Sequence, residues 1–181
     1  ANLITLSRLP VLLIVVSMLY SANAAVRVAS VFGIVILILL DTVDGIVARA
    51  RRQVSLMGSV LDIMADRVVE LVLWIVYADV NLIPVAIPII YVMRGTIVDS
   101  LRSVHVSEGE APFKAMRTGL GKWLVASPVM RTTYGISKLI SFAGLAFTHA
   151  LAAYVARGVG SANALRTSLL IFQITSWISV A

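Results

Sequence analysis

Four aspartates, Asp41, Asp44, Asp62 and Asp66, lie close together in a sequence that is 60% hydrophobic. If the segments that carry them are helical, Asp41 and Asp44 share one helix face, because residues three or four apart lie on the same side. Asp62 and Asp66 share a face for the same reason. Two such helices side by side would direct four carboxylates to one point, where like charges repel unless a cation lies between them. Hard divalent cations take oxygen ligands, so the pattern predicts a site for Mg²⁺ or Mn²⁺.

A simpler interpretation is that these acids form solvated helix ends and pair with nearby arginines. The available partners are Arg49, Arg51, Arg52 and Arg67. Pairing accounts for one or two acids, but not for four at matching helical offsets with Gly45 and Gly58 between them. A charged Asp in mid-membrane costs roughly 2.5–3.5 kcal/mol, and a helical glycine about 1 kcal/mol relative to alanine. Because these residues lower stability by amounts of this size, their presence favours a functional site over a purely structural role.

The composition predicts an integral membrane protein. The chain has 181 residues, only 13% of them charged, against roughly 25% in soluble domains, and its mean hydropathy is +0.98. Apolar runs approach the roughly 20 residues that a membrane-spanning helix needs. We therefore predict one all-α polytopic domain over residues 1–181, with six transmembrane helices. The expected spans are 3–20, 24–50, 56–77, 82–103, 127–155 and 162–181, with a cytosolic loop over 104–122.

The basic residues predict the orientation of these spans. They gather in the second-to-third and fourth-to-fifth connections, at Arg49, Arg51, Arg52, Arg102, Lys114, Arg117 and Lys122. The positive-inside rule places both connections in the cytosol, and the acidic cluster with them at the cytosolic face of the cell membrane. The net charge of +6 is then explained by these flanks and by membrane lipids, so we expect no nucleic-acid partner. Ala1 is not an initiator methionine, which leaves open whether a soluble domain precedes it.

The spacing of the acidic stretch resembles a known signature. Residues 41–49 read DTVDGIVAR and residues 58–66 read GSVLDIMAD. Together they match D-x2-D-G-x2-A-R-x8-G-x3-D-x3-D, the pattern of class I CDP-alcohol phosphotransferases, also called CDP-alcohol phosphatidyltransferases. The opening residues 2–9, NLITLSRL, are also similar to the start of many members.

This resemblance implies a reaction. Most members transfer a substituted phosphate from a CDP-linked lipid donor to a small polar alcohol during phospholipid biosynthesis, and they release CMP. They have six transmembrane helices and commonly form homodimers. The donor diphosphate repels an attacking oxygen, and a pair of Mg²⁺ or Mn²⁺ ions can neutralise this charge and stabilise the leaving CMP.

The resemblance also implies roles for individual residues. The metal ligands would be Asp41, Asp44, Asp62 and Asp66. Asp66 would also be the catalytic base, because a carboxylate within hydrogen-bond reach can take the acceptor's hydroxyl proton. The nucleotide pocket would be formed by Asp44, Gly45, Ala48, Arg49 and Gly58. The guanidinium of Arg49 offers a planar fork suited to phosphate.

The acceptor side is less specific. Arg94 and Arg102 lie on similar sides of the fourth predicted span, and Arg131 and Lys138 share a face of the fifth. These four cations could bind a phosphate on the acceptor, as in relatives that use glycerol phosphate or inositol phosphate. They could instead extend to the cytosolic interface or pair locally. The sequence names neither the acceptor alcohol, the lipid backbone of the donor nor the preferred metal.

Two other functions share the acidic chemistry. A UbiA-type membrane prenyltransferase also uses aspartates and Mg²⁺, but its two motifs lie far apart in a longer chain. A divalent-cation transporter would place acids near mid-membrane and often repeats half of its sequence. The compact motif disfavours the prenyltransferase, and the position of the acids at one cytosolic end, with no visible repeat, disfavours the transporter.

Overall fold

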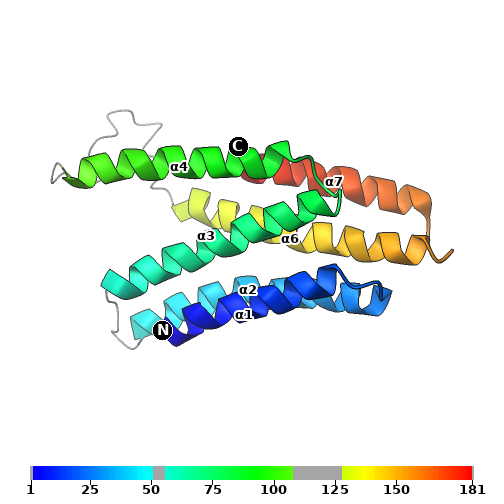
Figure 1. Ribbon diagram of the computed structural model, residues 1–181, viewed down its shortest axis with the longest axis horizontal. Helices are drawn as coiled ribbons and strands as arrows, with labels where there is room; N and C mark the ends of the chain where they lie inside the picture. The colour runs from blue at the N-terminus through cyan, green and yellow to red at the C-terminus, as the bar shows by residue number, and fades with distance from the viewer. Residues whose placement is uncertain (1, 51–55, 108–127, 181) are drawn as a thin grey trace.

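The computed structural model describes residues 2–50, 56–107 and 128–180, and within them every regular element is a helix. The helices are α1 (Asn2–Leu19), α2 (Ala24–Ala50), α3 (Leu56–Asp79), α4 (Ala86–Ser107), α6 (Pro128–Val155) and α7 (Ala162–Val180). Figure 1 shows them as an elongated bundle in which successive helices alternate in direction. The start of α1, the end of α2 and the start of α3 therefore lie at the same end of the bundle. The predicted all-α class is confirmed for this part of the chain.

Asparagine residues shape two of the turns between the helices. The Asn23 side chain accepts a hydrogen bond from the Ala25 backbone N–H at 3.0 Å, which caps the start of α2. After α3, Asn81 takes a φ of 60°, a left-handed conformation that asparagine tolerates better than most residues. These turns reverse the chain between α1 and α2 and between α3 and α4.

The fourth helix differs from its prediction. It was expected over 82–103, but α4 begins at Ala86 and continues to Ser107. Leu82 and Ile83 lie in the preceding turn, where their side chains are buried in the core. These two residues are therefore apolar because they are buried in the core, and not because they belong to a helix. At the other end, residues 104–107 belong to α4, and the rest of the predicted loop lies outside the described residues.

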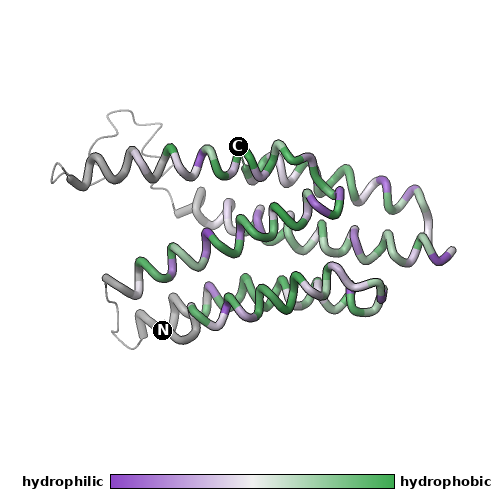
Figure 2. The backbone as a smooth tube through the Cα atoms, viewed as in Figure 1, coloured by the Kyte–Doolittle hydropathy of each residue, from purple (hydrophilic) through white to green (hydrophobic). Residues whose placement is uncertain are grey.

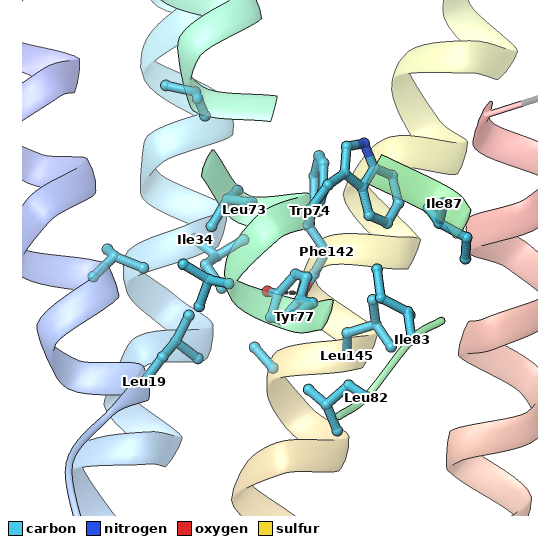
Figure 3. Packing of buried hydrophobic residues seen from close by; sticks show 14 of the residues in the cluster. Leu19, Ile34, Leu73, Trp74, Tyr77, Leu82, Ile83, Ile87, Phe142 and Leu145 are labelled. Atoms are coloured by element: carbon cyan, nitrogen blue, oxygen red, sulfur yellow. Dashed lines mark hydrogen bonds between the residues drawn. The ribbon is translucent and has the colours of Figure 1, made fainter. Parts of the chain in front are cut away.

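The helices pack around one apolar core. The main contacting pairs are α1 with α2 and α3, α2 with α6, α6 with α7, and α4 with α3 and α7. At the centre, the ring centroids of Trp74 and Phe142 are 4.5 Å apart, and the Tyr77 hydroxyl donates a hydrogen bond of 2.6 Å to the Phe142 carbonyl (Figure 3). Because α1 contacts both α2 and α3, it lies where it can join the two helices of the acidic motif.

The outer surface is unusually apolar. Hydrophobic residues run along most of each helix in Figure 2, and all six described helices expose large apolar side chains. Examples are Leu13, Phe32, Ile63, Met93, Phe147 and Ile178. Within the described residues, two segments are long and apolar enough to cross a membrane, Ala24–Asp41 and Thr132–Val155. Thr5–Leu19 and Ala86–Ile97 are shorter apolar stretches, so crossing by all six helices stays a prediction.

Candidate active site

The aspartates of the motif lie inside the helices, away from their ends. Asp41 is on α2 and marks the end of its apolar segment, whereas Asp62 and Asp66 are one turn apart on α3. At 1.5 Å per residue, Asp41 lies about 14 Å before the end of α2 at Ala50. The carboxylates therefore occupy the boundary between the apolar part of the bundle and its more polar end.

Three of these carboxylates converge on one cation, the guanidinium of Arg8 on α1. Nη1 of Arg8 donates a hydrogen bond to Asp41 Oδ1 at 2.8 Å and lies 3.8 Å from Asp62 Oδ1. Its Nη2 donates to Asp66 Oδ1 at 3.4 Å. The Arg8 residue is only 1% exposed, while the three acids remain partly accessible. One buried positive group thus joins the carboxylates of α2 and α3, whereas their spacing predicts a metal ion at this position.

A second cation approaches the other oxygen of Asp66. Lys138 Nζ on α6 lies 3.7 Å from Asp66 Oδ2 and also forms an ion pair with the buried Glu70. Glu70 accepts a 3.5 Å hydrogen bond from the Tyr134 hydroxyl. That hydroxyl accepts a 3.3 Å hydrogen bond from Arg94. Lys138 therefore lies beside the acidic site, and Arg94 is linked to Glu70 through Tyr134.

Other predicted residues have surroundings that the structure leaves undescribed. Asp44, Gly45, Ala48 and Arg49 lie on α2, Arg102 lies on α4 and Arg131 lies on α6. Gly58 lies in the first turn of α3 and is half-buried. Their assigned roles in binding the nucleotide and the acceptor therefore stay predictions.

The donor set suits a hard divalent cation. Asp41, Asp62 and Asp66 present carboxylate oxygens around one position, which the Arg8 guanidinium occupies in this structure. Carboxylate oxygens are the ligands that Mg²⁺ and Mn²⁺ prefer. Within the side chains described here, no group of three acids, histidines or cysteines is assembled closely enough to hold an ion. The side chain of Asp44 is outside the described set. Among the described carboxylates, the guanidinium of Arg8 lies between Asp41 and Asp66.

Sequence reasoning missed two participants. Arg8 was treated only as part of the similar opening sequence, although a lone arginine within an apolar helix is itself a reason to suspect a site. Tyr134 was not singled out, and no spacing pattern connects it to the acids on α3. Glu70, one turn after Asp66 on α3, forms an ion pair with Lys138.

Comparison with known proteins agrees with the geometry. A family model described as CDP-alcohol phosphatidyltransferase matches residues 1–179, which include Arg8, the aspartate motif and Lys138. No curated protein matches the chain. Because the match extends over nearly the whole length, the chain belongs to the CDP-alcohol phosphatidyltransferase family of membrane-associated transferases, which transfer a phosphate-linked alcohol from a CDP-alcohol to an acceptor.

Proposed function

We propose that this protein is a metal-dependent enzyme of phospholipid synthesis that uses a CDP-linked lipid as donor and a small polar alcohol as acceptor, and releases CMP. The observation that carries the proposal is the convergence of Asp41 from α2 with Asp62 and Asp66 from α3 on one positively charged position. Family membership gives the reaction type, and this convergence supports the proposal that the reaction takes place at these carboxylates.

The metal ligands in this proposal are Asp41, Asp44, Asp62 and Asp66, around one or two Mg²⁺ or Mn²⁺ ions. When bound, the metal would neutralise the donor diphosphate and stabilise the charge on departing CMP. The small residues Gly45, Ala48 and Gly58 would give the nucleotide room beside α2 and α3, and Arg49 would contact its phosphate.

In the transfer step, Asp66 would accept the proton of the acceptor hydroxyl. The acceptor oxygen then forms a bond to the phosphorus that carries the lipid, and the bond from that phosphorus to the CMP oxygen breaks. No covalent enzyme intermediate is needed. The 36% exposure of the Asp66 side chain supports this role, because the base must be reachable by a bound alcohol.

The cations next to Asp66 support a phosphorylated acceptor, such as glycerol phosphate or inositol phosphate. Lys138 lies 3.7 Å from Asp66, and its ammonium could bind a phosphate while the acceptor hydroxyl faces the carboxylate. Arg94, Arg102 and Arg131 complete the proposed acceptor pocket. Lys138 contributes most directly, because it already contacts the proposed base.

The membrane setting is part of the proposal. Six spans, an active site at the cytosolic face and contact with membrane lipids would explain why every described helix exposes large apolar side chains. A homodimer is proposed as well, on the family resemblance.

The test is a screen of acceptor alcohols with purified protein, a CDP-linked lipid and Mg²⁺ or Mn²⁺. CMP release identifies the active acceptor, and mass spectrometry of the product identifies the transferred group. The Asp62→Asn variant is the inactive control. Absence of CMP release with all acceptors and both metals, from protein that still binds CMP, would contradict the proposed reaction.

A further inference from the structure

Arg8 has a position that the proposed reaction does not explain. It is a charged residue with 1% exposure on α1, a helix whose residues 5–19 form an apolar stretch. Its two terminal nitrogens contact Asp41 on α2 and Asp66 on α3 at 2.8 and 3.4 Å, and Asp62 lies 3.8 Å away. These are the carboxylates that the proposed function assigns to the metal.

The contacts of Arg8 leave part of its hydrogen-bonding capacity unused. Its Nε is buried and has no hydrogen-bond partner among the described residues. A guanidinium has five donors, and a site built only for stability would be expected to pair them, often in a two-pronged contact with one carboxylate. Arg8 instead divides its terminal nitrogens between acids on two helices. This arrangement distributes one positive charge over several negative groups.

We propose that Arg8 is the built-in counter-ion of the metal-binding carboxylates, and that a divalent cation must displace its guanidinium to bind them. The inference rests on the proposed metal site and adds a competitor for it. Without metal, three acids on two helices would repel one another, and Arg8 offsets that repulsion from inside the bundle. With metal, the same oxygens would coordinate the ion, and the guanidinium would have to move away from them.

Two other roles for Arg8 predict different measurements. If Arg8 only anchors α1 to α2 and α3, its loss would lower stability and leave the intrinsic metal affinity unchanged. If Arg8 stays in place beside a bound ion as a supporting donor, its loss would weaken metal binding. Of the three roles, only competition with the metal predicts that loss of Arg8 strengthens metal binding and also lowers the stability of the metal-free protein.

The experiment compares wild type, Arg8→Met, Arg8→Lys and the control Arg166→Met in detergent, without nucleotide or lipid. Arg166 is an exposed residue of α7, so its replacement makes the same chemical change away from the site. Thermal unfolding is followed in chelator, and Mn²⁺ affinity is measured by electron paramagnetic resonance of the free ion. We expect Arg8→Met to have the lowest melting temperature in chelator and the largest gain with Mn²⁺. Its Mn²⁺ dissociation constant should be about tenfold lower than that of wild type, which corresponds to losing one competing charge-assisted contact.

Arg8→Lys keeps the positive charge and should remain close to wild type in both measurements, as should Arg166→Met. If Arg8→Met is too unstable to purify, adding Asp41→Asn removes one repelling charge and should recover metal-free stability beyond the sum of the single effects. Equal or weaker Mn²⁺ binding by Arg8→Met than by wild type would overturn the inference. Failure of wild type and all variants to bind Mn²⁺ would instead overturn the proposed metal site.

Discussion

Lys138 on α6 approaches the Asp66 carboxylate on α3 to 3.7 Å, although the two residues lie in different halves of the sequence. The contact places the proposed base next to a cation that could hold the acceptor. Glu70, one turn after Asp66, pairs with the same ammonium and keeps it at this position. The packing of α6 in the bundle, and not the aspartate motif, therefore brings the proposed acceptor-binding ammonium to the proposed base.

Replacing the proposed base should separate binding from turnover. In Asp66→Asn, we expect the rate of CMP release to fall at least about a hundredfold, since general bases contribute about 10²–10⁴-fold. CMP affinity should change far less. Asp79→Asn is the matched control, because it makes the same change at the opposite end of α3. A purified Asp66→Asn protein with a wild-type rate would exclude the base role.

Metal removal should abolish the reaction. Because the proposed mechanism needs a cation to neutralise the diphosphate, excess chelator should stop CMP release, and added Mg²⁺ or Mn²⁺ should restore it. CMP should raise the melting temperature only when a divalent metal is present, since a ligand stabilises the folded state in proportion to its binding. Undiminished turnover in chelator, or stabilisation by CMP without metal, would count against the metal site.

Replacing Lys138 should weaken binding of the acceptor and leave binding of the donor almost unchanged. We expect Lys138→Ala to raise the KM for a phosphorylated acceptor at least about tenfold, because one charge-assisted contact contributes roughly 1.5–3 kcal/mol. The KM for the CDP-linked donor should stay within about twofold by the same reasoning. Steady-state kinetics with each substrate varied in turn provide the measurement. An unchanged acceptor KM in the Arg131→Ala/Lys138→Ala double variant would remove the acceptor-phosphate site.

The contact between α6 and α7 can be tested at Gly144. A Cβ added there would lie 2.2 Å from ring atoms of Phe172, and an aromatic ring in a packed interface cannot shift freely. Gly144→Ala should therefore lower stability by about 1–3 kcal/mol, the usual cost of overpacking. Gly135→Ala on the same helix is the control, because a Cβ there meets nothing within 4 Å. That variant should be neutral or slightly more stable, since alanine favours helix. Equal melting temperatures for the two variants would contradict the packing described.

A pH effect is expected at the opposite end of the bundle. The Tyr20 hydroxyl, just after α1, donates a hydrogen bond of 2.5 Å to Asp79, and this bond to a carboxylate raises the pKa of Tyr20 above 10.0. A raised folded-state pKa gives stability that is fully present below pH 10 and is lost as the pH rises through the folded pKa. The melting temperature of wild type should thus fall toward that of Tyr20→Phe above pH 10. A difference between them that stays constant through alkaline pH would contradict this assignment.

The family match distinguishes this chain from two other kinds of protein that share its acidic chemistry. The short interval between the two acidic pairs disfavours a prenyltransferase of the UbiA type, and acids at one end without a visible repeat disfavour a cation transporter. The family match over residues 1–179 agrees with that choice. Five of the six described helices begin and end close to their expected limits, because long apolar runs in a membrane leave the backbone few conformations other than helix.

The sequence determined the helical class, the motif and the alignment of Asp62 with Asp66, because these depend on composition and on the 3.6-residue period of one helix. It did not determine where Leu82 and Ile83 would lie, since an apolar residue can be buried in a turn as readily as in a helix. Only the tertiary structure decided that Arg8 from α1 and Lys138 from α6 meet the acids of α2 and α3. Contacts between distant helices depend on how their faces pack, and no periodicity within a single helix records that choice.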